Sequence, residues 1–315
     1  MTKALVTGGA GFIGSNLVRA LLERGDEVRV LDNFSTGNRT NLTGLDAEIV
    51  EGELRSYERV HNAVRGVEVV YHLGALGSVP RSVQDPLTSN AVNVEGTLNV
   101  LAAARDEGVR RVVYSSSSSI YGSSGELPRT EAMPSDPISP YGVAKLAAER
   151  YCVSFSRVYE RFETVVLRYF NVFGPNQSPL TQYAAVVPLF LTLIAHGEPV
   201  PIHGDGEQSR DFTYVDNVID ATLRAADAAG ASGQVFNVAA GTPATVNHLA
   251  DTIASILGKP VEKQHLAPRP GDVRESWADV GAARRLLGYE PRVSLDEGLR
   301  ILAEAMESPL GRPAR

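Results

Sequence analysis

The first residues of the chain combine a short apolar segment, a glycine-rich turn and the start of an amphipathic helix. Lys3–Thr7 has the composition of a buried strand, and Gly8-Gly9-Ala10-Gly11-Phe12-Ile13-Gly14 follows it directly. Glycine permits a tight turn, and without a side chain it lets backbone N–H groups approach a pyrophosphate at the positive end of a helix. We therefore expect Gly8, Gly11 and Gly14 to form a phosphate-binding turn. The alternative is a purely structural turn before a helix.

A second apolar segment, Glu27–Asp32, ends in a carboxylate 18 residues after Gly14. At this distance from the glycine turn, an acidic residue can accept a hydrogen bond from the ribose hydroxyl of a bound dinucleotide. A carboxylate there repels an added 2′-phosphate, so the sequence favours NAD over NADP. Arg39, a little further on, leaves NADP open as an alternative.

Short apolar runs alternate with helical patterns through the first half of the chain, which is typical of an α/β fold with a doubly wound, Rossmann-type parallel sheet. Six strands are predicted: Lys3–Thr7, Glu27–Asp32, Ala47–Glu51, Val67–Leu73, Arg111–Ser115 and Thr164–Arg168. Residues 1–170 form the expected NAD-binding domain, with returning segments near residues 212–240. Residues 171–307, which are rich in proline and glycine, form mainly a smaller, interleaved substrate-binding lobe. Residues 308–315 are expected to be a frayed tail.

Composition excludes several classes of protein. Hydrophobic residues make up 43% of the 315 residues and charged residues 21%, which predicts an ordinary globular core. The formal net charge of −7 argues against nucleic acid or an anionic membrane as a partner. Cys152 is the single cysteine, so no internal disulfide can form, and the scattered Cys and His residues predict no metal site. With no signal-like or membrane-spanning apolar run, the expected location is the cytoplasm.

Tyr141 and Lys145 lie four residues apart, so on a helix both side chains project from one face. A nearby ammonium and a bound nicotinamide cation would lower the pKa of the phenol and make it a usable base. The spacing alone is common on helix surfaces. Upstream, Ser115–Ser119 is a run of five serines directly after a predicted strand, where parallel sheets bind ligands. The run is either a set of hydroxyls that line a pocket or a flexible linker.

These motifs together resemble the extended short-chain dehydrogenase/reductase family. The resemblance rests on the glycine turn, Asp32-Asn33, Tyr71-His72-Leu73, Asn93–Thr97, Ser117, Tyr141 and Lys145. Four further segments are similar to the nucleotide-sugar-modifying, NAD-dependent epimerase/dehydratase branch: Arg168–Pro175, Gly204–Phe212, Tyr214–Asp216 and Pro268–Asp272. His72, at the end of a predicted strand, is expected to shape the loop rather than to act as an acid or base.

The resemblance implies roles for individual residues. The implied catalytic residues are Ser117, Tyr141 and Lys145. The residues implied to hold NAD are Gly8, Gly11, Phe12, Ile13, Gly14, Asp32, Asn33, Glu53, Leu54, Leu73, Gly74, Asn93, Ser115, Tyr141, Lys145 and Tyr169. The residues implied to hold a UDP-sugar are Ser78, Arg81, Ser117, Ser118, Ser119, Asn171, Val187, Arg210, Arg269 and Asp272. Arg210 and Arg269 could instead be surface ion-pair partners. The chain departs mildly from the family pattern at Glu53-Leu54 and at Gly74, where alanine is usual.

The reaction implied is that of a UDP-sugar 4-epimerase. Sugar 4,6-dehydratases in the family carry Thr-Asp-Glu where this chain has Ser117, Ser118 and Ser119, and a hydroxyl is a feeble acid or base for eliminating water. Ser276, where a large tyrosine closes the pocket of glucose-restricted epimerases, predicts room for a bulkier sugar. The sequence favours UDP-glucuronate and UDP-N-acetylglucosamine equally as the substrate. The alternatives are a dehydratase or reductase of the same family, or a non-catalytic NAD-binding regulator.

Two segments, 93–107 and 141–159, carry extra apolar residues and resemble the helix pair through which family members form dimers. A homodimer is therefore expected. The alternative is that both apolar stripes face the sheet.

Overall fold

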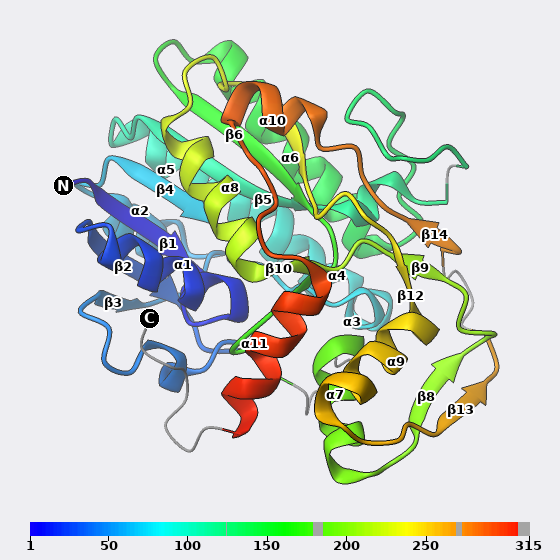
Figure 1. Cartoon of the computed structure of the whole chain (residues 1–315). Coiled ribbons are helices and arrows are strands. Elements are labelled where there is room, and N and C mark those ends of the chain that lie inside the picture. Colours follow the sequence, from blue (N-terminus) through cyan, green and yellow to red (C-terminus); the bar gives the residue numbers. More distant parts are fainter. Residues whose placement is uncertain (124, 179–184, 269–272, 308–315) are drawn as a thin grey trace.

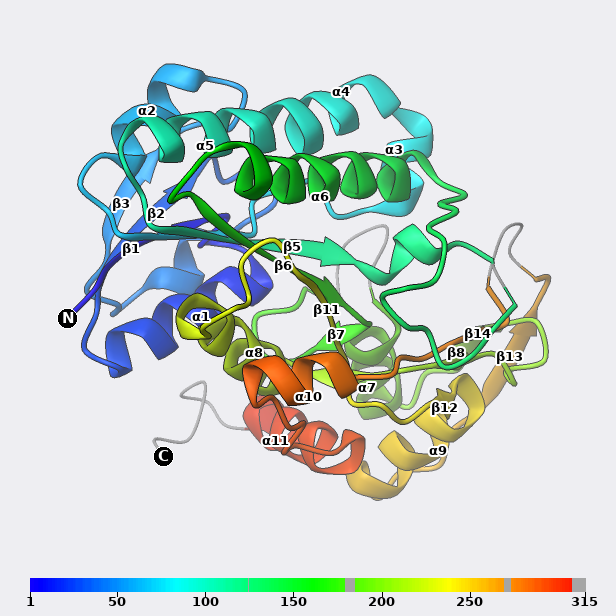
Figure 2. The same cartoon turned by 90° about the horizontal axis from the view of Figure 1, so that it is seen from above.

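The computed structural model describes residues 1–123, 125–178, 185–268 and 273–307. In this part of the chain seven strands form one sheet in the order β11-β6-β5-β4-β1-β2-β3, and every neighbouring pair is parallel (Figure 1, with β11 labelled in Figure 2). The strands are β1 (Lys3–Thr7), β2 (Glu27–Asp32), β3 (Glu48–Glu51), β4 (Val69–His72), β5 (Arg111–Ser117), β6 (Glu163–Tyr169) and β11 (Val235–Val238). The predicted doubly wound α/β fold is confirmed.

The sheet has one strand more than the six predicted. β11 comes from a segment far along the chain and pairs with β6, with Val235 opposite Val166 and Val238 opposite Tyr169. Its four residues are too few to be distinguished by pattern alone from other short apolar runs. β5 also ends two residues later than predicted, at Ser117, because its pairing with β6 continues to Ser117 opposite Tyr169.

Helices cover both faces of the sheet (Figure 2). One face carries α2 (Tyr57–Val64), α3 (Val79–Gln84), α4 (Pro86–Asn90), α5 (Gly96–Asp106) and α6 (Pro140–Val158). The other face carries α1 (Phe12–Glu23) and α8 (Val215–Asp227). Strands buried on both faces consist of nearly continuous apolar residues, which is why β1 reads Lys-Ala-Leu-Val-Thr with four of its five residues buried. Each face has its own hydrophobic cluster, so the sheet separates two cores.

In the described residues, the smaller lobe is built from short strands and three helices. β8 (Val200–His203) pairs with β13 (Lys263–Leu266), while β9 (Ser209–Arg210) lies between β12 (Ala244–Thr245) and β14 (Glu275–Ser276). β7 (Val172–Phe173) pairs with β10 (Thr213–Tyr214). The helices of the lobe are α7 (Val186–His196), α9 (Val246–Leu257) and α11 (Leu295–Glu307), whereas α10 (Gly281–Leu287) packs against β11 and α8 of the large sheet (Figure 2). Outside this lobe, among the loops of the large sheet, the described chain has three short helical turns: η1 (Arg39–Leu42), η2 (Ala91–Glu95) and η3 (Ser118–Tyr121).

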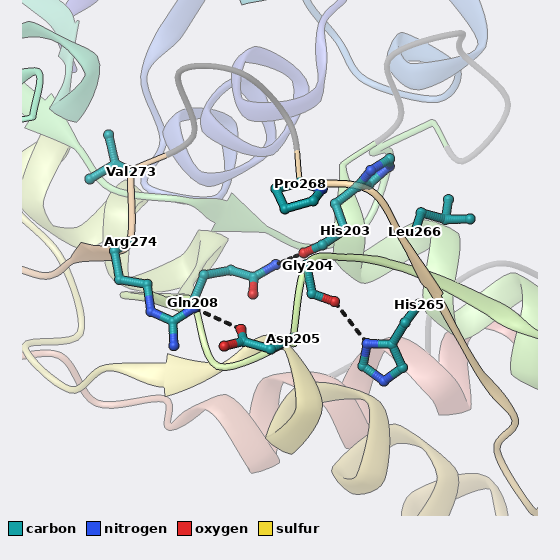
Figure 3. Close-up of a pocket in the computed structure, with 9 residues that line it drawn as sticks. All are labelled: His203, Gly204, Asp205, Gln208, His265, Leu266, Pro268, Val273 and Arg274. Carbon is teal, nitrogen blue, oxygen red and sulfur yellow. Dashed lines mark hydrogen bonds and ion pairs between the residues drawn. The ribbon is translucent and has the colours of Figure 1, made fainter.

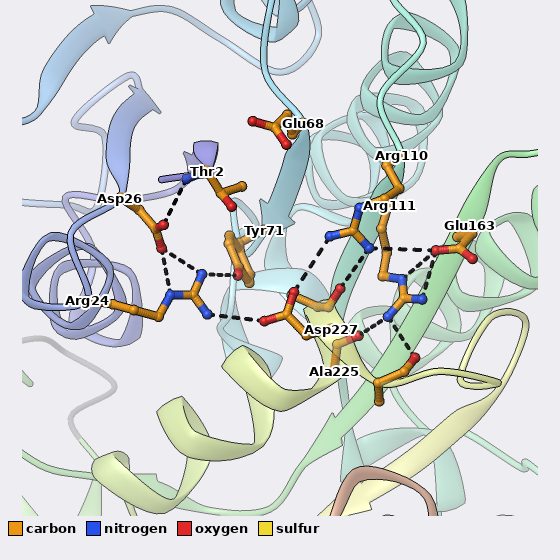
Figure 4. Close-up of polar contacts among 12 residues, drawn as sticks. Thr2, Arg24, Asp26, Glu68, Tyr71, Arg110, Arg111, Glu163, Ala225 and Asp227 are labelled. Atoms are coloured by element: carbon orange, nitrogen blue, oxygen red, sulfur yellow. Dashed lines mark hydrogen bonds and ion pairs between the residues drawn. The ribbon is translucent and has the colours of Figure 1, made fainter.

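Charged side chains tie the helices to the amino end of the sheet (Figure 4). Arg111 in β5 contacts Glu163 in β6, with 2.7 Å between Nη2 and Oε2, and also donates to the backbone oxygen of Ala225 in α8. Asp227 at the end of α8 meets Arg24 at 3.4 Å and Arg110 at 3.6 Å. The carboxyl end of the sheet, opposite this network, is where the predicted site residues gather. None of the helices in the described ranges has the length and apolar content that crossing a bilayer requires.

A nucleotide-binding edge and a serine, tyrosine and lysine cluster

The glycine turn between β1 and α1 is closely packed. Gly8 has a left-handed φ of 69°, and its N–H donates to Leu31 O at 2.8 Å. A Cβ on Gly14 would lie 2.1 Å from Gly8 O, so no side chain fits there without moving the turn. Gly11 caps α1 without a side-chain hydrogen bond, and the first N–H groups of a helix have no partner within it. The turn therefore presents the backbone donors of Phe12, Ile13 and Gly14, as a pyrophosphate requires.

Asp32, at the end of β2, supports this turn. Its Oδ2 accepts from Ala10 N at 2.9 Å and its Oδ1 from Phe34 N at 2.8 Å. A carboxylate has about four acceptor positions, so two remain for a ribose. Arg39 forms an ion pair with Glu51 and stacks on Phe34, with 3.9 Å from the guanidinium carbon to the ring centre. Arg39, the residue for which NADP was an alternative cofactor, thus contacts Glu51 and Phe34.

The two departures from the family pattern are coupled. A Cβ on Gly74 would lie 2.9 Å from Leu54 Cδ1 and 3.1 Å from Thr7 Oγ1, so the side chain of Leu54 occupies the space that an alanine would need. Glu53 points elsewhere and forms an ion pair with Arg55. Asn33 accepts from Ser35 N at 3.1 Å and is exposed.

A hydrogen-bonded relay fixes the loop after β4. His72 Nδ1 lies 2.7 Å from Thr7 Oγ1, and its Nε2 lies 2.9 Å from Thr97 Oγ1. The Asn93 side chain accepts from Leu76 N at 2.8 Å and donates to Leu76 O at 3.1 Å. Burial, then the charge of Lys145, lowers the pKa of His72 to about 3, so the imidazole stays neutral. His72 therefore shapes the loop as predicted, and the side chain of Asn93 acts on the loop that begins with Leu73 and Gly74.

The serine run is part of the fold. Ser115, Ser116 and Ser117 complete β5, and Ser118 begins η3. Ser116 donates to Glu149 Oε2 at 2.9 Å, and Ser117 accepts from both the N–H and the hydroxyl of Ser119. Ser115, Ser116 and Ser117 therefore belong to a strand, and Ser118 and Ser119 to a helical turn, rather than to a flexible linker.

Helix α6 carries Tyr141 and Lys145 to the end of β5. Ser139 caps the helix by accepting from Gly142 N at 3.1 Å, and Tyr141 N donates to Ser82 Oγ in α3 at 3.0 Å. Lys145 is 3% exposed, and its Nζ donates to Ser115 O at 2.8 Å. Burial lowers the pKa of Lys145 to about 8.

The Tyr141 hydroxyl lies near enough to Ser117 for that side chain to act on its pKa, and Lys145 Nζ donates to Ser115 O, so the three predicted catalytic residues lie together at the end of β5. Burial raises the pKa of Tyr141, and the side chain of Ser117 opposes this rise. Burial is thus the larger effect among the groups of the chain itself, and the lowering of this pKa by Lys145 together with a bound nicotinamide cation stays a prediction.

A buried ion pair, which the sequence reasoning missed, lies one turn beyond Lys145. Arg168 in β6 donates through Nη2 to Glu149 Oε1 at 2.6 Å and through Nε to Oε2 at 3.1 Å. Arg168 Nη1 also donates to Tyr121 OH at 2.7 Å, and that hydroxyl donates to Asn237 Oδ1 in β11 at 2.6 Å. Tyr141, Lys145 and Glu149 share one face of α6 because they follow at intervals of four, and that spacing was the available signal.

The predicted substrate residues are placed less uniformly. Asn171 has a left-handed φ of 28°, and its buried Nδ2 has no hydrogen-bond partner in the described structure, as expected of a group that waits for a ligand. Ser78 caps α3 by accepting from Arg81 N at 3.2 Å. Arg210 in β9 donates to the backbone oxygen of Ser209 at 2.7 Å.

Three other predictions meet different outcomes. Val187 is buried in the core of the smaller lobe. The hydroxyl of Tyr169, predicted to contact the cofactor, lies 2.7 Å from Thr222 Oγ1 in α8. Arg269 and Asp272 lie outside the described residues.

A cavity of about 690 Å³ opens in the smaller lobe (Figure 3). It lies beside the ends of β8 and β13 and is lined by His203, Gly204, Asp205, Gln208, His265, Leu266, Pro268, Val273 and Arg274. Arg274 and Asp205 form an ion pair at 2.7 Å across it. The scattered histidines show no metal-ligand spacing, and the sequence signal for this part of the lobe is the neighbouring Gly204-Asp205-Gly206 segment.

Comparison with known proteins defines the family. Residues 4–239 match the model of the NAD dependent epimerase/dehydratase family. The chain belongs to this family. NAD is its cofactor, in agreement with the glycine turn and Asp32.

Solved structures of this kind are close in fold. The UDP-glucose 4-epimerase of Thermotoga maritima with UDP-glucose is 40% identical, with a TM-score of 0.93, covering 98% of this chain and 99% of that one. The UDP-N-acetylglucosamine 4-epimerase of Methanobrevibacter ruminantium M1 in complex with UDP-N-acetylmuramic acid is 36% identical, with a TM-score of 0.92, covering 96% and 97%. The Thermus thermophilus UDP-glucose 4-epimerase complex with NAD is 36% identical, with a TM-score of 0.90, covering 98% and 99%.

Proposed function

We propose that the protein is a UDP-sugar 4-epimerase that inverts the configuration of a hexose at carbon 4. The observation that carries this proposal is the meeting of Ser117, Tyr141 and Lys145 at the end of β5, on the same edge of the sheet as the glycine turn. The solved structures named as UDP-sugar 4-epimerases, which align along nearly the whole chain, support it.

Each catalytic side chain has one task. Tyr141, as the phenolate, takes the proton of the 4-hydroxyl, and Ser117 donates a hydrogen bond to the same substrate oxygen. Lys145 places a positive charge beside the site while it remains protonated, below its pKa of about 8. Bound NAD supplies reversible hydride transfer at carbon 4. The resulting 4-keto sugar would turn about its phosphate linkage, and Tyr141 would hold the proton in the meantime and return it to the 4-oxygen when the opposite face is reduced.

Elimination of water is disfavoured by the groups at this site. The positions that carry carboxylates in dehydratases are Ser118 and Ser119. Glu149 is buried and held by Arg168 and Ser116, so it cannot replace them. With only hydroxyls available, the groups at this site serve oxidation and reduction at one carbon.

The nucleotide would be held by the smaller lobe. The cavity beside the ends of β8 and β13 is the proposed site of the base and ribose, and Arg210 and Asn171 are the proposed anchors of the diphosphate. Guanidinium groups suit phosphates because they donate several hydrogen bonds from a fixed planar fork. The anchoring roles of Arg269 and Asp272 stay part of this proposal.

For the sugar we retain UDP-N-acetylglucosamine and UDP-glucuronate as the expected substrates. Ser276 lies opposite Arg210 in the pairing of β14 with β9, and its small side chain leaves room for a substituent on the hexose. Ser118, Ser119 and Arg81 are the groups expected to meet that substituent.

A homodimer is also proposed. Val143 and Tyr151 on α6 and Val83 and Leu87 beside it are exposed by 53%, 41%, 63% and 82%. On α5 the apolar residues are already buried within the chain, namely Val100, Leu101, Ala103 and Ala104. The proposed dimer interface is therefore formed by α6 and its neighbours α3 and α4. Light scattering after size exclusion tests this, and a monomer at micromolar concentration would contradict it.

The decisive experiment incubates the purified protein with UDP-glucose, UDP-N-acetylglucosamine and UDP-glucuronate and separates the 4-epimers by chromatography. We expect epimer formation without accumulation of NADH for at least one substrate, and loss of turnover with retained NAD binding in Tyr141→Phe. Stoichiometric NADH would instead indicate a dehydrogenase. Absence of any conversion by a protein with NAD bound would favour a regulator.

A further inference from the structure

The ammonium of Lys145 lies in the interior without a carboxylate partner among the described residues. Lys145 is 3% exposed, and its Nζ donates to Ser115 O at 2.8 Å. Glu149, one turn further along α6, contacts Arg168 and Ser116 instead. A lysine ammonium has three N–H donors, so one carbonyl satisfies only a part of it. The buried charge needs a further source of stabilisation.

The ring of Tyr114 in β5 is the second contact of this ammonium. Lys145 Nζ lies over the ring, 5.0 Å from its centre. A cation within about 6 Å of an aromatic centre is attracted by the negative face of the ring. Tyr114 is 1% exposed, so little water is present to weaken this attraction.

The ring of Tyr114 is fixed by its neighbours on the sheet. Tyr114 stands opposite His72 in the parallel pairing of β4 with β5, and the two ring centres are 5.6 Å apart with the planes tilted by 36°. His72 is itself held by the hydroxyls of Thr7 and Thr97. The aromatic face under Lys145 therefore belongs to the same packed unit as the strand that leads into the glycine turn.

The other titratable groups around Lys145 do not replace the ring. Burial lowers the pKa of His72 and raises that of the Cys152 thiol, so both are neutral near pH 7. Burial also raises the pKa of Tyr141, so its resting form is the neutral phenol. The groups in question are Tyr141, Glu149 and Cys152 on α6, His72 in β4, Tyr114 in β5 and Arg168 in β6.

We propose that Tyr114 is a positioning residue whose aromatic face holds the Lys145 side chain beside the site as a cation. This inference rests on the proposed function, in which the positive charge of Lys145 acts on Tyr141. It gives a task to a residue that the proposed mechanism does not use. Tyr114 acts only through Lys145 and needs no contact with the sugar.

The contact should be visible in the titration of Lys145. Burial lowers the pKa of Lys145 to about 8, and the aromatic face opposes this fall because it favours the charged form. A cation–π contact away from water corresponds to about half to one and a half pH units. Without the contact, the protonated fraction of Lys145 near pH 8 would fall about two- to fifteenfold.

The test is a titration of lysine in protein labelled with carbon-13 at lysine Cε and saturated with NAD. The chain has four lysines, at positions 3, 145, 259 and 263, and Lys145→Met identifies the signal of Lys145. The other three signals serve as internal references. Tyr114→Phe keeps the aromatic face, so we expect the pKa of Lys145 to stay within about 0.3 units of that of the wild type.

A graded series at position 114 then weakens the face without changing its shape. Phenylalanines that carry one, two or three ring fluorines have a progressively less negative face. The pKa of Lys145 should fall stepwise, by about half to one and a half units with three fluorines. The alkaline limb of kcat should move by the same amount, with an unchanged KM for the UDP-sugar that the epimer assay identifies.

A matched control changes another ring in the same hydrophobic cluster. Phe155 also packs there, further along α6, and its ring contacts Tyr159 and Phe162. The trifluorinated residue in place of Phe155 should leave the pKa of Lys145 unchanged. A shift equal to that at position 114 would make the effect a general one of the fluorinated core and overturn the inference.

The titration separates this inference from the proposed function because it needs no turnover. A pKa of Lys145 that is the same throughout the fluorinated series, or that rises along it, would overturn the inference. A stepwise fall supports it, also where Tyr141→Phe keeps its activity. In that case the proposed function fails while the contact between Lys145 and Tyr114 stands.

Discussion

Replacing Arg168 by methionine removes one half of a buried ion pair without removing the carboxylate. Glu149 is 0% exposed at its side chain and Arg168 2%, so the carboxylate would keep only Ser116 as a hydrogen-bond donor. Breaking a buried pair in this way costs about 3–5 kcal/mol of unfolding free energy. Glu149→Leu should cost a similar amount, because the guanidinium would be left with Tyr121 alone.

The double variant Arg168→Met with Glu149→Leu removes both charges together. The double variant still loses unfolding free energy because Ser116 and Tyr121 each lose a hydrogen-bond partner. Each group left unsatisfied costs about 1–3 kcal/mol. Tyr121 keeps its bond to Asn237, which places its share at the low end. We therefore expect the double variant to be destabilised by at least about 2 kcal/mol less than the sum of the two single variants.

Urea unfolding is the assay. Far-UV circular dichroism reports the sheet and helices, and the fluorescence of Trp277, the single tryptophan, reports the smaller lobe. If the free-energy losses of the two single variants add to that of the double variant within about 0.5 kcal/mol, the two residues are not coupled and the argument is refuted.

Three further outcomes are expected. Gly14→Ala should weaken NAD binding more than about tenfold, because its Cβ would lie 2.1 Å from Gly8 O and the turn must move; calorimetric titration with NAD measures this, and unchanged affinity would contradict it. Lys145→Met should become less stable relative to wild type between pH 8 and 10.5, by up to about 3 kcal/mol, because burial lowers the pKa of Lys145 from 10.5 to about 8 and the folded state carries a buried charge that it loses first. Urea unfolding at both ends of that range checks the sign. The buried Asp211 has its pKa raised from 3.8 to about 6, so its contribution to stability should fall as pH rises from 4 to 6, and Asp211→Asn should flatten that change in unfolding free energy.

The parts of the site predicted well are those that depend on neighbours in sequence. The glycine turn, the carboxylate at the end of β2 and the spacing of Tyr141 and Lys145 are local, so the periods of a strand and a helix suffice to place them. Parallel strands then bring their carboxyl ends to one edge of the sheet, which is why residues 7, 32, 72 and 117 gather there.

The parts that were missed depend on contacts between distant segments. No pattern around Glu149 shows that Arg168, on another element, will occupy both of its oxygens. The space that Leu54 takes from Gly74 depends on how one loop packs against another. The direction of the bonds at Ser117 depends on the turn that follows it, and five identical serines give no sign of which one accepts.

We expect two acidic residues on adjoining strands to share the preference for NAD over NADP. Asp32 and Glu51 stand opposite each other in the pairing of β2 with β3. One carboxylate discourages a phosphate on the adenosine ribose, while the other occupies the arginine that would attract it. If Asp32 alone were replaced, Arg39 would still be paired with Glu51. Conversion toward the phosphorylated dinucleotide therefore calls for replacing Asp32 and Glu51 together.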